Sequence, residues 1–236
     1  MHYNKDQTAV LYFTRSAHEE ARAKTFYTSG SFAHNKAIAQ KLIDHTYKQV
    51  LASDLPVKVW DTASQRGRSF GEKLGNAFQS LFDEGYENVI AVGNDCIQLS
   101  AGTLNYTAEL LQKEPLVAGP TTDGGTYLLG INRKAFHKNR FSKLAWQTDL
   151  LLDDFIRYAK KKGHQLRQLS TSTDIDNEDG LRQSISSVYG SALYFRLAII
   201  LQCILSTSAF VNRTRHITFT SHHLYLSISY RGPPLS

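Results

Sequence analysis

Hydrophobic and polar positions follow two different periods along this chain. Short apolar runs predict strands, and several are apolar without alternation, which is typical of strands buried on both faces. Between them, apolar residues recur at helical spacing, as Ile38, Leu42 and Val50 do within residues 34–51. The runs that predict strands are residues 8–14, 57–60, 89–92, 115–120, 126–131 and 164–169. This order of strands and helices predicts an α/β layered domain with a largely parallel sheet.

Capping signals mark the ends of the predicted helices. Ser69 is a candidate N-cap, and Glu72 follows it at the spacing of a capping box. Gly85 is a natural stop for the helix that begins there. The helix predicted over residues 149–162 ends in a basic turn before a glycine, as the helix dipole favours. Two more helices are predicted, at about residues 101–112 and in the segment that follows residue 176.

The C-terminal part of the chain differs in kind from the rest. Residues 191–210 are apolar over about 20 positions, the length at which a membrane span must be considered. Arg196 and Gln202 interrupt them, and a charge within a span is costly in lipid, so we favour a soluble docking helix over membrane association. Residues 215–230 alternate like a hairpin. We therefore expect a domain at residues 1–188 and an extension at residues 189–236 that packs on the domain or on a partner, as in a homodimer.

Charge and cysteine content exclude some classes of function. The net charge of the 236 residues is +6, but residues 181–236 hold five arginines and no acidic residue. The first 180 residues are close to neutral, with 22 basic and 21 acidic side chains, so the domain lacks the basic footprint of a nucleic-acid binder. The two cysteines form no disulfide framework, and the N-terminal residues lack the apolar core of a signal peptide. These features predict a cytoplasmic protein.

The apolar run that ends at Val92 leads directly into Gly93, Asn94 and Asp95. In open α/β sheets, ligands bind outside the carboxyl ends of the strands, so Asp95 stands where chemistry usually happens. A carboxylate there can hold a hard divalent cation whose other ligands are phosphate oxygens. The alternative is a turn or helix N-cap aspartate, which is common between a strand and a helix.

Four further segments carry candidate chemistry, and each has a structural alternative. The Asp-Gly-Gly at residues 123–125 lets backbone N–H groups approach a phosphate, or it forms a hairpin turn. The acidic residues within 174–179 face a cation, or they begin a short helix in solvent. The glycine-rich residues 64–75 precede a helix and suit anion or base recognition, but they contain no P-loop. Arg22 and Lys24 follow the first strand and its loop, where they meet a triphosphate or lie solvated at the surface.

Five blocks of the chain occur in an order that resembles a known family. The blocks are "QRGRSFGEKLGNAF", "VIAVGNDCIQLS", "AGPTTDGGTYLLGI", "LAWQTDLLLDD" and "DIDNEDGL". Their order resembles that of the uncharacterised glycosyltransferase-like proteins often found near radical-SAM and selenium-linked genes, a branch of the nucleotide-diphospho-sugar transferase superfamily. The resemblance covers roughly residues 8–185 and implies a three-layer α/β/α Rossmann-like GT-A fold with a mostly parallel sheet.

The resemblance also implies a role for each matching residue. It implies a transferase that uses Mg²⁺ or Mn²⁺, with the metal held by Asp95, Asp174 and Asp176. Lys24 and Asp123 would join Asp95 as catalytic residues. The donor, a nucleotide sugar or an NTP, would contact Arg22, Lys24, Gln65, Gly67, Gly71, Glu72, Gly93 and Asn94. A small-molecule acceptor would contact Gly124, Gly125, Thr126, Trp146 and Thr148.

Departures from the family pattern leave the reaction open. Asn94 stands for a serine, Ile97 for a proline and Gln147 for the serine of a W-S-T block. The N-terminal segment keeps Lys24 and Thr25 but lacks the glycine before them and the arginine after them. This loss favours a nucleotide-sugar donor over an NTP. The alternative is a catalytically silent GT-A-like module that acts through the apolar, basic residues 189–236.

Overall fold

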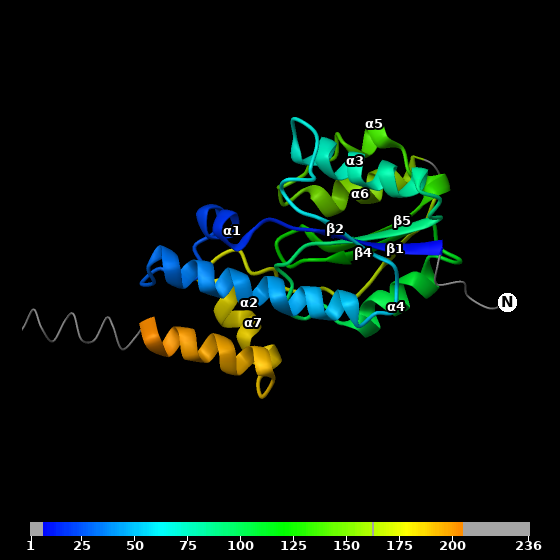
Figure 1. Ribbon diagram of the computed structural model, residues 1–236. Coiled ribbons are helices and arrows are strands. Elements are labelled where there is room, and N and C mark those ends of the chain that lie inside the picture. Colours follow the sequence, from blue (N-terminus) through cyan, green and yellow to red (C-terminus); the bar gives the residue numbers. More distant parts are fainter. Residues whose placement is uncertain (1–6, 162, 205–236) are drawn as a thin grey trace, which may run out of the picture.

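The computed structural model describes residues 7–161 and 163–204 (Figure 1). A six-stranded sheet crosses the middle of the molecule in the order β2-β1-β3-β5-β4-β6. Strand β5 runs antiparallel to both of its neighbours, and the other three strand pairs are parallel, which confirms the mostly parallel sheet. The strands are β1 (Thr8–Phe13), β2 (Val57–Trp60), β3 (Asn88–Val92), β4 (Leu116–Pro120), β5 (Thr126–Asn132) and β6 (Leu166–Gln168).

Helices cover both faces of this sheet. In Figure 1, α3, α5 and α6 lie above the sheet, and α2 and α4 lie below it. Two short 3-10 helices lie at Arg133–Ala135, after β5, and at Ser186–Val188, near the end of the described chain. The labelled helices are α1 (Ala17–Ala23), α2 (Phe32–Leu51), α3 (Phe70–Asp83), α4 (Ala101–Leu110), α5 (Lys138–Phe141), α6 (Leu151–Lys160) and α7 (Glu178–Ile185), and a further helix at 192–204 is described below. The three-layer α/β/α arrangement is therefore confirmed.

Alternation along the strands divides the core into two clusters. Leu11 and Ala91 point to the face covered by α3 and α6, and they pack in one cluster with Phe78 and Phe155. Their neighbours in sequence point the other way and pack against α2 and α4. Every residue of β3 is buried. This burial on both faces explains why β3 is apolar without alternation.

The predicted helix ends hold, with one difference in detail. Ser69 caps α3, because its hydroxyl accepts a hydrogen bond from the backbone N–H of Glu72. The carboxylate of Glu72 accepts instead from the backbone N–H of Arg68, at 2.7 Å, so the reciprocal half of the capping box is missing there. Gly85 and Gly163 both adopt positive φ, at +106° and +67°, which glycine tolerates at a helix end.

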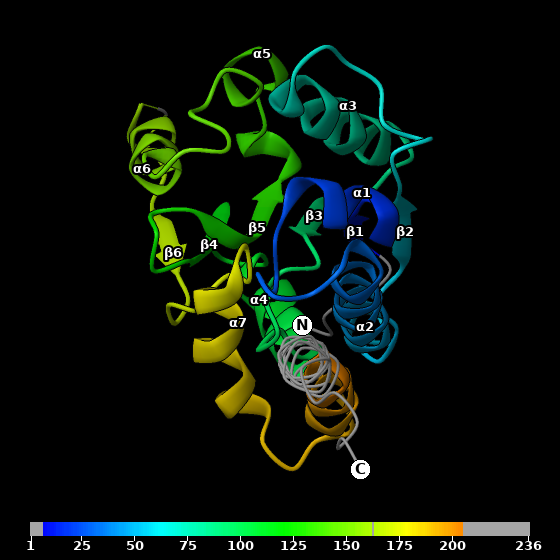
Figure 2. The ribbon, with the colours of Figure 1, turned by 90° about the vertical axis from the view of Figure 1, so that its left-hand side faces the viewer.

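The C-terminal described residues form a helix at 192–204 that lies beside α2 (Figure 2). Leu193 and Leu197 are buried in a third apolar cluster with Ile38 and Leu42 of α2. Within residues 7–161 and 163–204, no helix combines the length and the apolar character needed to cross a bilayer. The predicted hairpin at residues 215–230 lies outside the described residues.

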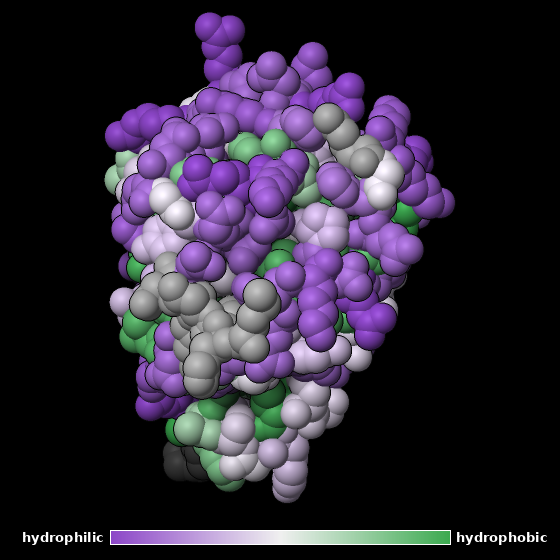
Figure 3. All heavy atoms as spheres, turned by 90° about the vertical axis from the view of Figure 1, so that its right-hand side faces the viewer, coloured by the Kyte–Doolittle hydropathy of each residue, from purple (hydrophilic) through white to green (hydrophobic). Residues whose placement is uncertain are grey.

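The amino and carboxyl ends of the parallel strands lie on opposite sides of the molecule. Figure 3 views the molecule from the side of the amino ends of β1 and β3, where the coloured side chains are mostly hydrophilic. The carboxyl ends of the same strands lead into the loops that bound the cavity described below. This placement agrees with the general rule for ligand sites in open α/β sheets.

Candidate functional site

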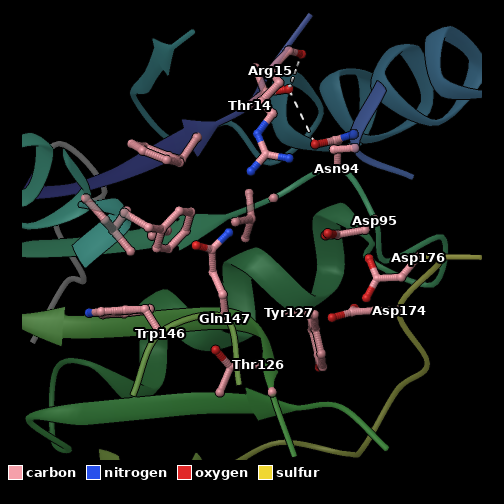
Figure 4. A pocket seen from close by; sticks show the side chains of 18 of the residues that line it. Thr14, Arg15, Asn94, Asp95, Thr126, Tyr127, Trp146, Gln147, Asp174 and Asp176 are labelled. Carbon is pink, nitrogen blue, oxygen red and sulfur yellow. Dashed lines mark hydrogen bonds between the residues drawn. The ribbon is translucent and has the colours of Figure 1, made fainter. Parts of the chain in front are cut away.

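A cavity of about 970 Å³ lies at the carboxyl ends of β1 and β3. The loops after these two strands form one wall, with Arg15 and Asn94, and the start of β5 forms another, with Thr126 (Figure 4). The segment around Gln147 and the acidic segment that contains Asp174 close the remaining sides. The cavity is large enough for a nucleotide-sized ligand, since ligand pockets span about 300–1,000 Å³.

A single ammonium group lies among three carboxylates in this cavity. Lys24 Nζ is 2.8 Å from Asp95 Oδ2 and 2.7 Å from Asp176 Oδ1. Glu20 Oε2 is 3.7 Å from the same nitrogen. Figure 4 shows Asp95, Asp174 and Asp176 pointing toward one another at one end of the cavity. The structure therefore brings Lys24 into contact with two of the three predicted metal ligands, Asp95 and Asp176, and places Asp174 beside them.

Backbone hydrogen bonds hold these distant segments in place. The backbone N–H of Ile175 donates to the carbonyl oxygen of Asp95 at 2.9 Å. Thr25, next to the lysine, forms an isolated parallel bridge with Asn177. The N–H of Thr28 also donates to the Glu178 carboxylate at 2.8 Å. The positions of the acidic residues thus depend on the backbone as well as on the ion pairs.

The carboxylates of the cluster differ in their proton affinity. Burial raises the pKa of Asp174 to about 9, and the neighbouring charges of Asp95 and Asp176 add to this effect. Asp174 Oδ1 is buried and has no hydrogen-bond partner among the described residues. Burial also opposes ionisation of Asp95, but the Lys24 ammonium outweighs it and keeps the Asp95 pKa below its usual value. Burial alone would lower the pKa of Lys24, yet Asp95, Asp176 and Glu20 raise it.

The carboxylate oxygens of the cluster suit a hard divalent cation as ligands, but their arrangement in this structure does not. Carboxylate oxygens are the ligands that Mg²⁺ and Mn²⁺ prefer, and the buried Asp174 Oδ1 is free to accept a bond. Even so, the described residues contain no group of three or more acidic, histidine or cysteine side chains arranged to hold a metal ion. The Lys24 ammonium lies where a cation between Asp95 and Asp176 would lie. The carboxylates fit a metal only after this ammonium has moved.

Asp95 is not a helix N-cap, which was one of the two structural alternatives for it, beside a turn aspartate. The N-cap of α4 is Ser100, whose hydroxyl accepts from the N–H of Thr103 at 3.1 Å. Asn177 likewise caps α7 by accepting from the N–H of Gly180. The helix alternative for the acidic segment is therefore correct in part, since α7 does begin there, while Asp174 and Asp176 face the cavity.

Most of the other residues predicted for the site also line the cavity. Gln65 does so while its amide donates to the backbone oxygens of Thr14 and Trp60, at 3.0 and 3.3 Å. Asn94 is buried and lies 3.5 Å from the Thr14 hydroxyl. Both side chains therefore also fix the loops around the site. The remaining predicted residues on the cavity wall are Arg22, Gly93, Asp123, Gly125, Thr126, Trp146 and Thr148.

The Asp-Gly-Gly segment forms the turn between β4 and β5, as its structural alternative predicted. Asp123 Oδ1 accepts from the Thr121 hydroxyl at 2.5 Å and from the N–H of Gly125 at 3.1 Å. Gly124 has φ +86°, and a Cβ there would lie 2.0 Å from the carbonyl oxygen of Asp149. Gly124 supports the turn and is not on the cavity wall.

Three residues that were predicted to contact the nucleotide donor do not line the cavity either: Gly67, Gly71 and Glu72. A Cβ on Gly71 would lie 2.2 Å from the carbonyl oxygen of Ser142 and 2.4 Å from the Trp146 ring, so this glycine allows close packing. Gly67 adopts φ +140° against the start of α3. Gly71 thus lets the ring of Trp146, which lines the cavity, pack against the start of α3.

Sequence reasoning missed several residues of the cavity. Arg15 follows the end of β1 and reaches into the cavity in Figure 4, and its position after a predicted strand was a usable signal. Lys73 and the half-buried Phe70 come from the first turn of α3, within the segment 64–75 that was predicted to suit anion or base recognition, although neither was assigned to the site. Phe70 packs on Trp146, with ring centroids 5.5 Å apart. Gln147 points into the cavity from a backbone with φ +61°, which no local pattern predicted.

Residues 31–148, half of the chain, match the model of a family described as an uncharacterized protein conserved in bacteria (DUF2064), and the chain belongs to this family. No curated protein matches the chain. A solved structure of a provisionally named nucleotide-diphospho-sugar transferase from Desulfovibrio desulfuricans is similar at a TM-score of 0.74. The two sequences are 18% identical, and the match covers 85% of this chain and 98% of that one. The fold is therefore that of the nucleotide-diphospho-sugar transferases, as the five sequence blocks implied.

Two other solved structures are similar at a much lower level. One is Rv0371c of Mycobacterium tuberculosis in complex with manganese, with 14% identity, coverage of 77% of this chain and 100% of that one, and a TM-score of 0.43. The other is the 4-diphosphocytidyl-2C-methyl-D-erythritol synthase of Anaerococcus prevotii, with 12% identity, coverage of 78% and 99%, and a TM-score of 0.44. At these scores, neither bears on the site of this chain.

Proposed function

We propose that this protein is a transferase that uses a nucleotide-activated donor and a divalent metal ion. One observation carries the proposal: Lys24 and the carboxylates of Asp95, Asp174 and Asp176 converge in a cavity at the carboxyl edge of the sheet. Their convergence from three distant segments has no evident structural need, since buried charges are costly and the backbone already joins these loops.

The diphosphate of the donor is proposed to lie between the basic side chains of the cavity and the acidic cluster. Arg15, Arg22 and Lys73 line the cavity and can bind phosphate oxygens. Lys24 is within reach of the same space and would hold the leaving diphosphate. Asp95, with Asp174 and Asp176, would hold Mg²⁺ or Mn²⁺, which when bound neutralises diphosphate charge.

The opposite wall is proposed to bind a small-molecule acceptor. Thr126, Trp146 and Thr148 lie there with Asp123, whose carboxylate is held by the Thr121 hydroxyl. Trp146 offers an apolar surface, and the threonines offer hydroxyl groups for orientation. Positioning and electrostatics would supply most of the rate, as in other transfers from a phosphate leaving group. Between glycosyl and nucleotidyl transfer, the altered N-terminal segment favours a nucleotide-sugar donor.

A thermal-shift screen tests the proposal. Nucleoside diphosphates, NTPs and nucleotide sugars are added with and without Mn²⁺, and one class is expected to raise Tm only when the metal is present. At a ligand concentration of 100 Kd, the expected rise is about 5 °C or more. Asp95→Asn should abolish the metal-dependent part. The matched control is Glu84→Gln, which also removes a carboxylate paired with a lysine, Lys58 at 2.6 Å, but outside the cavity.

A catalytically silent binding module is the second candidate. Phe195 and Ile199 are 57% and 62% exposed on the helix at residues 192–204, so this segment carries apolar surface that a partner could cover. The two candidates differ in the screen above. If no nucleotide raises Tm in a metal-dependent way and Asp95→Asn changes nothing, the transferase proposal is wrong and the module remains.

A further inference from the structure

Lys24 occupies the position that a cation shared by Asp95 and Asp176 would take. Its nitrogen lies within 2.8 Å of one oxygen from each carboxylate. We infer that Lys24 is a built-in counter-ion of the acidic cluster, and that a divalent metal enters only when its ammonium leaves the two aspartates. The inference rests on the proposed metal-dependent function and adds a residue that controls access to the metal site.

The charges around Lys24 prevent its ammonium and a divalent metal ion from occupying the acidic cluster at the same time. Three carboxylates lie within 3.7 Å of the Lys24 ammonium, those of Glu20, Asp95 and Asp176. The Lys24 ammonium is the cation between Asp95 and Asp176, and its side chain is only 14% exposed, whereas Glu20 also pairs with Arg15 at 4.0 Å. A divalent ion on the same two oxygens would stand a few ångströms from the ammonium, where like charges repel strongly in a partly buried site. The lysine must therefore withdraw before the metal binds.

The local structure allows the lysine to move while the carboxylates stay. Lys24 is the C-cap of α1, and its side chain has a flexible four-carbon stem that borders the cavity. The acidic segment is attached by other contacts: the N–H of Ile175 on the Asp95 carbonyl, and the bridge between Thr25 and Asn177. None of these contacts uses the lysine side chain. Removing its charge should therefore leave the oxygen ligands in place.

Binding order follows from this arrangement. A phosphate group that enters the cavity competes with Asp95 and Asp176 for the ammonium of Lys24. Once the ammonium has turned to the phosphate, both carboxylates are free for the metal. The protein alone is therefore expected to bind the metal weakly, and the donor to prepare the site. This arrangement avoids a metal held in the cavity without its donor.

The test measures binding of Mn²⁺ alone, by electron paramagnetic resonance of the free ion and by calorimetry. Lys24→Met keeps the length of the stem and removes the charge, so Kd for Mn²⁺ is expected to fall at least about tenfold below that of the unchanged protein. Lys24→Gln should give a similar gain and serves if the methionine variant does not fold. The matched control is Lys73→Met, which removes the same charge from the same cavity. Lys73 forms no ion pair with a carboxylate among the described residues, so the Kd of this variant for Mn²⁺ should stay within about twofold.

Two results of the Mn²⁺ binding test overturn the inference. Either the Lys24 variants bind Mn²⁺ no more tightly than the unchanged protein, or Lys73→Met shows the same gain, which would make the effect one of general cavity charge. A second readout needs no variant: Mn²⁺ should speed the acetylation of Lys24 several-fold, measured by peptide mass spectrometry, because the amine leaves its carboxylate partners. Bound Mn²⁺ without a faster reaction also refutes it. Since no nucleotide is present, these results are separate from those of the nucleotide screen.

Discussion

Asp174 is expected to destabilise the fold at neutral pH, and Asp174→Asn should relieve this cost. The folded pKa of Asp174 is raised from 3.8 to about 9, first by burial and then by the charges of Asp95 and Asp176. The folded protein therefore holds a proton that the unfolded chain releases. The stability associated with that proton is complete below pH 4 and is lost as pH rises from about 4 to about 9.

The magnitude follows from the interval between the unfolded pKa and the working pH. At pH 7 this interval is about three pH units, and each unit corresponds to about 1.4 kcal/mol, so the upper limit is about 4 kcal/mol. Lys24 lies in the same cluster and lowers this limit. We expect Asp174→Asn to raise the free energy of unfolding by about 1–4 kcal/mol at pH 7. The asparagine amide can also donate to a neighbouring carboxylate, which the unpartnered Asp174 Oδ1 does not do.

Urea denaturation at pH 4.5, 6, 7.5 and 9 measures this effect. The gain of Asp174→Asn over the unchanged protein should be small at pH 4.5 and should grow with each step to pH 9. Asp83→Asn is the matched control, because Asp83 is exposed at the end of α3 and lies off the cavity. A gain that is the same at every pH, or a loss of stability at pH 7.5, would show that Asp174 is ionised and well accommodated.

Substitutions at Gly71, Ser16 and Gln147 test how local structure supports the site, with Gly102 as a control position. Gly71→Ala should lower the free energy of unfolding by about 1–3 kcal/mol, because the added Cβ would lie 2.2 Å from the Ser142 carbonyl oxygen. In the control Gly102→Ala, the Cβ meets only Ser100 Oγ at 3.6 Å, so urea denaturation should show no loss of stability. Ser16→Ala removes the capping box of α1 and should cost about 1 kcal/mol by the same measurement. The backbone at Gln147 has φ +61°, which suits glycine and not a β-branched residue. Gln147→Gly should therefore change the free energy of unfolding by less than about 1 kcal/mol, while Gln147→Val should lower Tm clearly. Equal effects of the two substitutions would contradict this argument.

Local patterns predicted the framework of the site well. The run ending at Val92 is a strand buried on both faces, and Asp95 follows it into the cavity. Ser69 begins a helix and Gly85 lies just beyond its end. These features depend on neighbours within one turn or one strand, so the sequence carries them directly. The five blocks then implied the fold that the similar solved structure shows.

Local patterns could not separate binding residues from packing residues. Gly71 and Gly124 read as places where a ligand approaches the backbone, but their free space is taken by Ser142 and Asp149. Nor did the sequence draw attention to Arg15, which becomes notable only because the cavity opens beside it. A glycine or an arginine in a loop has the same local signature in either role.

The sequence by itself determined which segments are buried and which carboxylates follow strands, because burial and backbone preference repeat with the period of each element. Only the tertiary structure decided what those carboxylates meet. Lys24, Asp95 and Asp176 are separated by 71 residues or more along the chain from one partner to the next, and their contacts exist because three loops are joined by long-range backbone hydrogen bonds. The ammonium of Lys24 therefore contacts the acidic cluster, whereas the sequence alone had suggested either a triphosphate or solvent as its surroundings.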